Sequence, residues 1–129
     1  TNGCFDIIHS GHVSYLSEAK GLGDILIIGL NSDASVKRLK GGNRPINNHH
    51  DRAIVLSALE AVDYVIIFDE DTPYNLIKTL KPDVLVKGGD WQPKDIIGSD
   101  IVISNGGKVI SLSYLEGKST TNIINKMRP

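Results

Sequence analysis

The chain has only one cysteine, few aromatic residues and no long apolar run. A lone Cys4 cannot form an internal disulfide, which fits the reducing cytoplasm. The longest apolar stretch, residues 25–30, falls far short of the roughly 20 residues that a membrane-spanning helix needs, and the sequence shows no secretory signal pattern. A formal net charge of −1 gives no general attraction to nucleic acid or to an anionic membrane. We therefore expect neither as a partner, and any bound phosphate must meet a local cluster of donors and cations.

With 129 residues, 40% of them apolar and 22% charged, the chain has the size and composition of one soluble domain. We treat residues 1–129 as that domain. The first residues, Thr1-Asn2-Gly3, lead directly into a motif and leave no room for a full strand. The first strand is therefore expected to be truncated, and further residues or a whole domain are expected upstream.

Short apolar, β-branched runs alternate with helical patterns along the chain. Strands are predicted at residues 25–30, 64–68, 84–87 and 108–113, with a truncated strand ending near Gly3. Helices are predicted at residues 12–20, 51–61, 73–80 and 120–127, while residues 98–105 fit either element. This alternation predicts an α/β fold, a doubly wound (Rossmann-like) parallel sheet of about five strands with helices on both faces.

Three local expectations accompany this fold. Apolar residues at the i, i+3, i+4 spacing predict one buried helix face, made of Ile54, Val55, Ala58, Leu59 and Val62. Thr72-Pro73 predicts an N-cap followed by the first residue of a helix. Residues 31–50 form one long polar stretch, which we expect to be a functional loop.

Ligands of doubly wound sheets bind beyond the carboxyl ends of the strands. The segments expected there are residues 3–12, 31–44, 88–91 and 115–121. The first contains His9-Ser10-Gly11-His12 at a strand-to-helix junction. A helix N-terminus attracts phosphate, Gly11 lets a ligand approach the backbone, and two histidines three residues apart can both donate to one phosphoryl group. No third metal ligand is evident beside them, so we predict no metal site.

Glu116-Gly117-Lys118-Ser119-Thr120-Thr121 stands just before the last helix. Ser119 or Thr120 can cap that helix, but capping explains one hydroxyl and not three in succession beside a glycine and a lysine. The other interpretation is a second phosphate cradle, for the β and γ phosphates of a nucleotide. The residues alone do not decide between the two.

Four cations, Lys37, Arg38, Lys40 and Arg44, lie close to two glycines in the long polar stretch. They form either a solvated surface or a mobile lid that neutralises a polyphosphate. Arg52 opens the following helix, where a cation opposes the helix dipole unless it faces an anion. Arg52 is therefore a candidate phosphate ligand.

Lys87-Gly88-Gly89-Asp90-Trp91 directly follows a predicted core strand. The two glycines let a flat ligand lie against the backbone, so Gly88, Gly89 and Asp90 are a candidate base site. Trp91, the only tryptophan, either covers the base or packs on the domain. At the end of the second strand, Asn31 and Asp33 are candidates for contacts to a second substrate.

In this order, the pieces resemble the cytidylyltransferase-like branch of the HxGH nucleotidyltransferases over nearly the whole chain. Residues 3–12 are similar to the family's G-x-F-D-x-x-H-x-G-H, and residues 116–121 to the end of its R-T-E-G-x-S-T-T signature. Within the branch, the sequence most resembles the adenylyltransferase domains of bacterial ADP-heptose synthesis. The short sequence segments that carry this likeness are residues 1–6, 31–35, 37–41, 44–45, 70–73, 86–90 and 119–124. Tyr114 stands where glycerol-phosphate cytidylyltransferases have arginine, which weakens that alternative.

The resemblance implies transfer of AMP from ATP to D-glycero-β-D-manno-heptose 1-phosphate, with Mg²⁺, for lipopolysaccharide core assembly in the cytoplasm. It also implies a heptose kinase domain fused upstream in many bacteria. With the clusters above, it makes His9, His12 and Lys40 the expected catalytic residues and Asp6 the carboxylate nearest to Mg²⁺. The expected nucleotide contacts are Gly3, Cys4, Phe5, Gly11, Lys37, Arg52, Lys87, Gly88, Gly89, Asp90, Glu116, Ser119, Thr120 and Thr121.

Two other functions stay open at this point. One is a cytidylyltransferase that acts on glycerol 3-phosphate or on another polyol or sugar phosphate. The other is a non-catalytic domain that binds a nucleotide without transferring it. Residue chemistry alone does not separate ATP from CTP, and it leaves open whether the protein forms a homo-oligomer.

Overall fold

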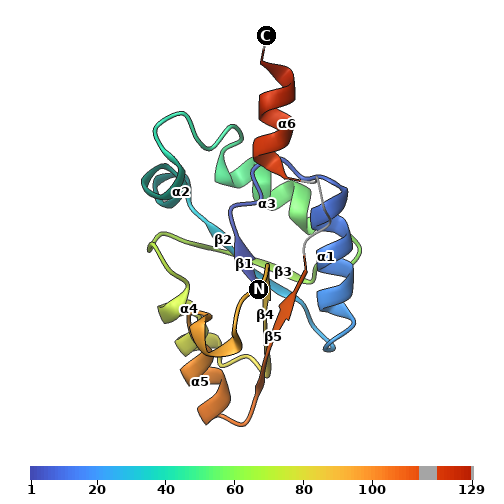
Figure 1. The fold of residues 1–129 in the computed structure, drawn as a ribbon, viewed down its shortest axis with the longest axis vertical. Coiled ribbons are helices and arrows are strands. Elements are labelled where there is room, and N and C mark those ends of the chain that lie inside the picture. The colour runs from blue at the N-terminus through green and yellow to red at the C-terminus, as the bar shows by residue number, and fades with distance from the viewer. Residues whose placement is uncertain (114–118, 129) are drawn as a thin grey trace.

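The computed structural model describes residues 1–113 and 119–128 (Figure 1). The strands are β1 (Asn2–Gly3), β2 (Ile27–Asn31), β3 (Tyr64–Phe68), β4 (Val84–Gly88) and β5 (Lys108–Leu112). The helices are α1 (Ser10–Lys20), α2 (Asp33–Lys40), α3 (His49–Ser57), α4 (Tyr74–Leu80), α5 (Ser99–Ser104) and α6 (Thr120–Met127), with a short 3-10 helix η1 (Pro93–Asp95). Within the described ranges, no helix is long and apolar enough to cross a membrane.

All strand pairs of the described residues are parallel, as predicted for an α/β fold. The strands form two hydrogen-bonded sheets, in the orders β1-β2-β3 and β4-β5, rather than the single sheet expected. The reason is the shortness of β1, whose two residues pair with β2 and do not extend the ladder to β4. Figure 1 shows α1 on one side of the strands and α4 and α5 on the other.

One apolar core nevertheless joins the two sheets. Its members share low exposure and mutual contact, and they are Phe5, Tyr15, Leu16, Ala19, Leu26, Ile28, Leu30, Leu56, Val62 and Val86. Val86 belongs to β4, while Ile28 and Leu30 belong to β2. Each large apolar side chain buried in this way contributes about 1.5–3 kcal/mol. The core therefore fixes β4 against the β1-β2-β3 sheet without hydrogen bonds between the strands.

The predicted helices are present, mostly with shifted ends. The ambiguous segment 98–105 contains a helix, α5, at Ser99–Ser104. The expected cap of α4 is wrong: Pro73 itself is the N-cap residue, and it makes no side-chain capping bond. The buried face expected at residues 54–62 is only partly confirmed: Ile54 is 67% exposed and Val55 is 47% exposed, whereas Val62 is buried and Leu59 packs against the core. Arg52 and Leu56 are the fully buried residues of that helix.

The long polar stretch contains a helix that we expected to be a loop. Ser32 caps α2 by accepting a hydrogen bond from the backbone of Ser35, and Asp33 lies in the first turn, where an acid favours helix formation. The helix ends before Gly41, whose φ of 108° is unfavourable for other residues. The predicted lid is therefore partly a helix, and Lys37 and Lys40 lie in its last turn.

Candidate active site

A cavity of about 690 Å³ lies at the carboxyl ends of β1, β2 and β4, the edge where a ligand was expected. Its volume is in the range of pockets for small molecules. Most of the predicted site residues line it: Gly3, Cys4, Phe5, His9, Gly11, His12, Asn31, Lys40, Lys87, Gly88, Ser119, Thr120 and Thr121. Lys37, Arg52, Asp33, Gly89 and Asp90 are not part of its lining. Glu116 lies outside the described residues.

His9 and His12 hold the start of α1 through reciprocal hydrogen bonds. His9 Nδ1 accepts from the backbone N–H of Gly11 at 3.1 Å, and His12 Nδ1 accepts from the backbone N–H of His9 at 3.3 Å. The two rings stack, with centroids 3.8 Å apart and planes at 27°. Two imidazoles therefore form a capping box that serine and glutamate usually supply.

These bonds determine which nitrogen of each ring carries hydrogen. In a neutral imidazole one nitrogen accepts and the other donates, so acceptance at Nδ1 leaves the hydrogen on Nε2. Burial, followed by the neighbouring His9, lowers the pKa of His12 to about 4. His12 is therefore neutral at physiological pH and offers an Nε2–H donor in the cavity.

We expect the lowered pKa of His12 to make stability depend on pH. The unfolded chain takes up the proton near pH 6.5, whereas folded His12 takes it up near pH 4. The stabilisation is therefore complete above about pH 6.5 and is lost as the pH falls toward 4. Urea unfolding at pH 7.5 and 4.5 of the wild-type chain and of His12→Asn, whose side chain does not titrate, should show a larger loss for the wild type. Equal losses would contradict this assignment.

The backbone before the helix is shaped by Phe5. Phe5 has a φ of 45°, and its ring packs over Gly3, where a Cβ atom would lie 2.9 Å from the ring. The centroid of the Phe5 ring lies 5.2 Å from the centroid of the His12 ring. Gly3 and Phe5 therefore position the loop and the second histidine, in addition to lining the cavity.

Asp6 anchors the segment between α2 and α3. Its carboxylate accepts from Arg44 Nε at 2.9 Å and from the backbone N–H groups of Ile46 and Asn47 at 2.8 and 2.9 Å. Burial raises the pKa of Asp6, but the bonds from Asn47, Ile46 and Arg44 outweigh that effect and leave the pKa below its ordinary value. The carboxylate is 0% exposed.

These contacts correct the expectation that Asp6 lies nearest to Mg²⁺. Its oxygens already accept several hydrogen bonds, and the described ranges contain no group of three or more His, Cys, Asp or Glu residues arranged to hold a metal ion. Mg²⁺ bound with a nucleotide takes its ligands largely from phosphate oxygens and water. The described residues therefore do not form a magnesium site of their own.

Arg52 is a buried clamp rather than a phosphate ligand, which corrects its predicted role. It is 1% exposed, and its guanidinium donates to the carbonyls of Cys4, Asn31 and Asn47 at 2.8–2.9 Å. It also pairs with Asp33 Oδ1 at 2.8 Å. Asp33 supplies the anion that a cation at the start of this helix requires. The pairing with Arg52 also explains why Asp33 lies outside the cavity lining.

Helix α2 brings Lys40 to the cavity and is tied to the loop after β3. Arg38 Nε donates to Asp71 Oδ1 at 2.7 Å, and Arg38 Nη2 donates to the carbonyl of Asp69. Lys37 is exposed and not in the lining. Of the two lysines in the last turn of α2, the structure therefore assigns only Lys40 to the cavity.

At the end of β4, Lys87 and Gly88 line the cavity, while Gly89 and Asp90 do not. Trp91 is 47% exposed, and its indole N–H donates to the carbonyl of Gly88 at 3.1 Å. Trp91 therefore packs against its own turn and is outside the lining. The candidate base site is reduced to Gly88.

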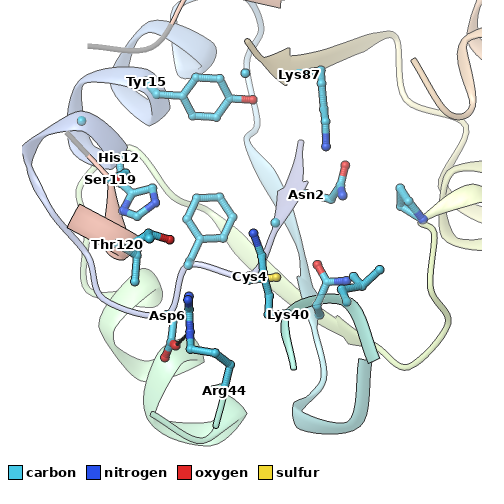
Figure 2. Close-up of a pocket in the computed structure, with 18 of the residues that line it drawn as sticks. Asn2, Cys4, Asp6, His12, Tyr15, Lys40, Arg44, Lys87, Ser119 and Thr120 are labelled. Carbon is cyan, nitrogen blue, oxygen red and sulfur yellow. Dashed lines mark hydrogen bonds and ion pairs between the residues drawn. The ribbon is translucent and has the colours of Figure 1, made fainter. Parts of the chain in front are cut away.

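At the start of α6, two of the three hydroxyls have structural partners. Ser119 Oγ accepts from the backbone N–H of Asn122 at 3.0 Å, and Thr120 Oγ1 donates to the carbonyl of Ile7 at 3.1 Å. The second bond attaches the start of α6 to the loop before α1, and Figure 2 shows Ser119 and Thr120 beside His12. Capping thus explains more of this cluster than we expected, although all three hydroxyl residues line the cavity.

Several lining residues were missed, notably Asp71, Thr72 and Pro73 after β3 and Ile97 before α5. Residues 71–73 follow a strand, so the rule that ligands bind beyond carboxyl ends of strands identifies them in principle. Ile97 has no comparable signal, because its place depends on how η1 and α5 pack.

Comparison with known proteins is consistent with this geometry. A family model described as cytidylyltransferase-like matches residues 1–126. The chain is 63% identical over 128 residues to the bifunctional protein HldE of a Nitratiruptor species, and 59% identical over 127 residues to the protein of the same name from Geobacter metallireducens. These matches cover 99% and 98% of this chain but 27% and 26% of the relatives, so the chain spans about a quarter of their length.

A solved structure is also similar. The crystal structure of the lipopolysaccharide core biosynthesis protein from Thermoplasma volcanium matches with a TM-score of 0.72 and 30% sequence identity. The match covers 89% of this chain and 94% of that one.

Proposed function

Since this chain belongs to the cytidylyltransferase-like family, we propose that it is a nucleotidyltransferase that transfers AMP from ATP to D-glycero-β-D-manno-heptose 1-phosphate. The products are ADP-heptose and pyrophosphate, and the pathway is lipopolysaccharide core synthesis. Support comes from the HldE relatives and from the similar structure of the T. volcanium lipopolysaccharide core biosynthesis protein. The relatives are called bifunctional and are about four times as long, which supports a second activity in those chains, the heptose kinase that the resemblance implies.

The observation that carries the proposal is the pair of histidines at the start of α1. Both accept backbone N–H groups at Nδ1, so both direct their donor capacity to Nε2. They line one cavity with Lys40 from α2 and Lys87 from β4. Imidazole N–H donors backed by cations suit a site in which negative charge increases on a phosphoryl group.

The reaction is an in-line displacement at the α-phosphorus. An oxygen of the sugar phosphate forms the new P–O bond, the bond to the bridging oxygen breaks, and pyrophosphate leaves with the electron pair. A phosphate monoester is largely a dianion near pH 7, because its second pKa is about 6, so no general base is needed. Catalysis then rests on positioning and charge stabilisation. His9 and His12 hold the α-phosphate and the bridging oxygen, Lys40 closes over the phosphates, and the start of α6 receives pyrophosphate.

The test is a pyrophosphate-release assay with ATP and CTP in parallel, each with heptose 1-phosphate and with glycerol 3-phosphate. We expect ATP with heptose 1-phosphate to give the highest kcat/KM, by about 10²-fold or more, because a site built around particular polar groups rejects partners that leave them unpaired. A preference for CTP and glycerol 3-phosphate would establish a cytidylyltransferase instead. ATP binding without pyrophosphate release in any combination would establish a non-catalytic nucleotide-binding domain.

A further inference from the structure

Two ammonium groups in the cavity lack a carboxylate partner among residues 1–113 and 119–128. They belong to Lys40 and Lys87. The carboxylates of the lining are those of Asp6 and Asp71, and both are already paired, Asp6 with Arg44 and Asp71 with Arg38. The cavity therefore has two cationic groups available for an anionic ligand.

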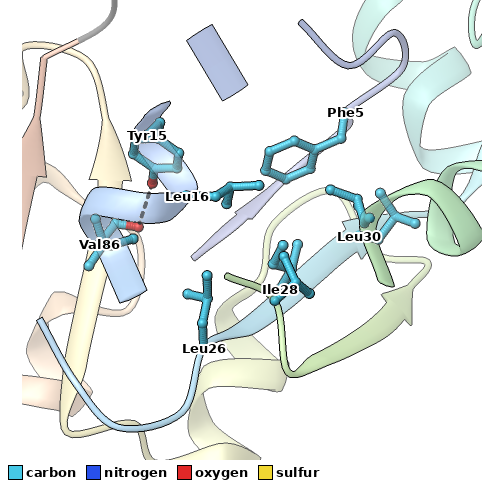
Figure 3. Close-up of a cluster of buried hydrophobic side chains, with 10 residues drawn as sticks. Phe5, Tyr15, Leu16, Leu26, Ile28, Leu30 and Val86 are labelled. Carbon is cyan, nitrogen blue, oxygen red and sulfur yellow. Dashed lines mark hydrogen bonds between the residues drawn. The ribbon is translucent and has the colours of Figure 1, made fainter. Parts of the chain in front are cut away.

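The position of Lys87 is fixed by its neighbours. Lys87 pairs with Ser111 in the β4-β5 ladder, and the preceding residue, Val86, accepts a hydrogen bond from the hydroxyl of Tyr15 on α1 at 3.2 Å (Figure 3). Burial lowers the pKa of Lys87; a negative charge on Cys4 opposes this effect, and the positive charge of Lys40 adds to it. Lys40 and Lys87 both line this one cavity.

Lys87 and His12 occupy different sides of that cavity. Figure 2 shows His12, Ser119 and Thr120 together on one side, with Lys87 extending from β4 toward Asn2 on the other. An in-line displacement requires the attacking and leaving oxygens to lie on opposite sides of the phosphorus. If pyrophosphate leaves toward α6, the attacking phosphate must approach from the side of Lys87.

We propose that Lys87 forms a second anion site, beside Lys40, that binds the phosphate group of the acceptor, a phosphate monoester. The inference rests on the function proposed above for the same cavity. It reassigns Lys87 from the nucleotide to the acceptor. Without these cations, the acceptor dianion would be repelled by the negatively charged phosphates of ATP. In a partly buried site this repulsion between like charges is only weakly screened.

The experiment measures KM for each substrate with Lys87→Met, which keeps an unbranched side chain and removes the charge. A charge-assisted hydrogen bond contributes enough for a loss of about 10- to 100-fold. We expect KM for heptose 1-phosphate to rise by that factor while KM for ATP changes less than about twofold, and Lys87→Arg should recover part of the loss. The matched control is Lys108→Met, an exposed lysine at the opposite end of the same ladder, which should leave both constants unchanged.

A second measurement uses inorganic phosphate and the wild-type chain, so it does not depend on a variant that folds. Phosphate should inhibit competitively against heptose 1-phosphate and not against ATP, and Lys87→Met should weaken this inhibition. A rise in KM for ATP alone, or phosphate inhibition that competes only with ATP, overturns the inference. No pyrophosphate release by the wild-type chain with heptose 1-phosphate and ATP contradicts the proposed function itself. In that case, the anion site can still be tested by measuring how much phosphate raises the melting temperature of the wild-type chain. This increase should be lost in Lys87→Met.

Discussion

Replacing His12 with alanine is expected to lower turnover by about 10²-fold or more, the usual effect of removing a donor that stabilises a transition state. The Nε2–H of His12 is present before substrate arrives, because Nδ1 is engaged by the backbone of His9. Its largest contribution comes when negative charge increases on the transferring phosphoryl group. We therefore expect kcat to fall while KM for ATP stays within a few-fold, measured by pyrophosphate release at saturating heptose 1-phosphate.

Two further variants of His12 separate catalysis from helix capping. In His12→Asn the amide oxygen can replace Nδ1 as the acceptor from His9, but no donor reaches the position of Nε2. In His12→Gln the amide nitrogen can approach that position, whereas the cap is lost. We expect the asparagine variant to be nearly as stable as wild type and strongly impaired, and the glutamine variant to be less stable and more active than the asparagine variant. Near-normal turnover of His12→Asn would exclude the proposed role.

Replacing Arg52 with methionine is expected to destabilise the fold by about 3–5 kcal/mol, mainly because three carbonyl groups lose their donor at a buried site. The guanidinium satisfies three carbonyls and the carboxylate of Asp33 at once. Methionine fills similar space but leaves these acceptors without their donor. Urea-induced unfolding, followed by circular dichroism, measures the change in the free energy of unfolding.

The matched control is Arg38→Met. Arg38 also pairs with an aspartate, Asp71, but both side chains are exposed, and such pairs contribute little to stability. Similar, small changes in the two variants would contradict the view that burial of Arg52 makes it a structural clamp.

The elements of the fold with local apolar patterns were predictable, and those that depend on distant partners were not. The strands β2 to β5 stand out as short β-branched runs. Helix α2 carries capping residues and a terminal glycine but little apolar surface, so apolar periodicity misses it. In α3 the apolar stripe containing Ile54 and Val55 is exposed. Arg52 takes a buried place because its acceptors come from Cys4 and Asn31, 48 and 21 residues away in the chain.

The same distinction applies to the candidate site. His9 and His12 were identifiable because one helical turn contains both, and local spacing fixes their relation. Arg52 and Asp33 lie outside the cavity lining for a common reason, because the two form an ion pair that local spacing does not reveal. Asp6 likewise resembles a metal ligand in sequence, and only the approach of residues 44–47 shows that its oxygens have other partners.

The reciprocal bonds between the histidines and the start of α1 have a consequence for the energetics of the proposed reaction. In water, dipoles must reorient around a phosphoryl group as its charge changes, and this reorganisation energy forms part of the barrier. Here the folding of one helical turn has already selected the tautomer of each imidazole and restricted its rotation. The orientation of both rings is therefore a property of the folded ground state, so the barrier to phosphoryl transfer contains little cost for turning them.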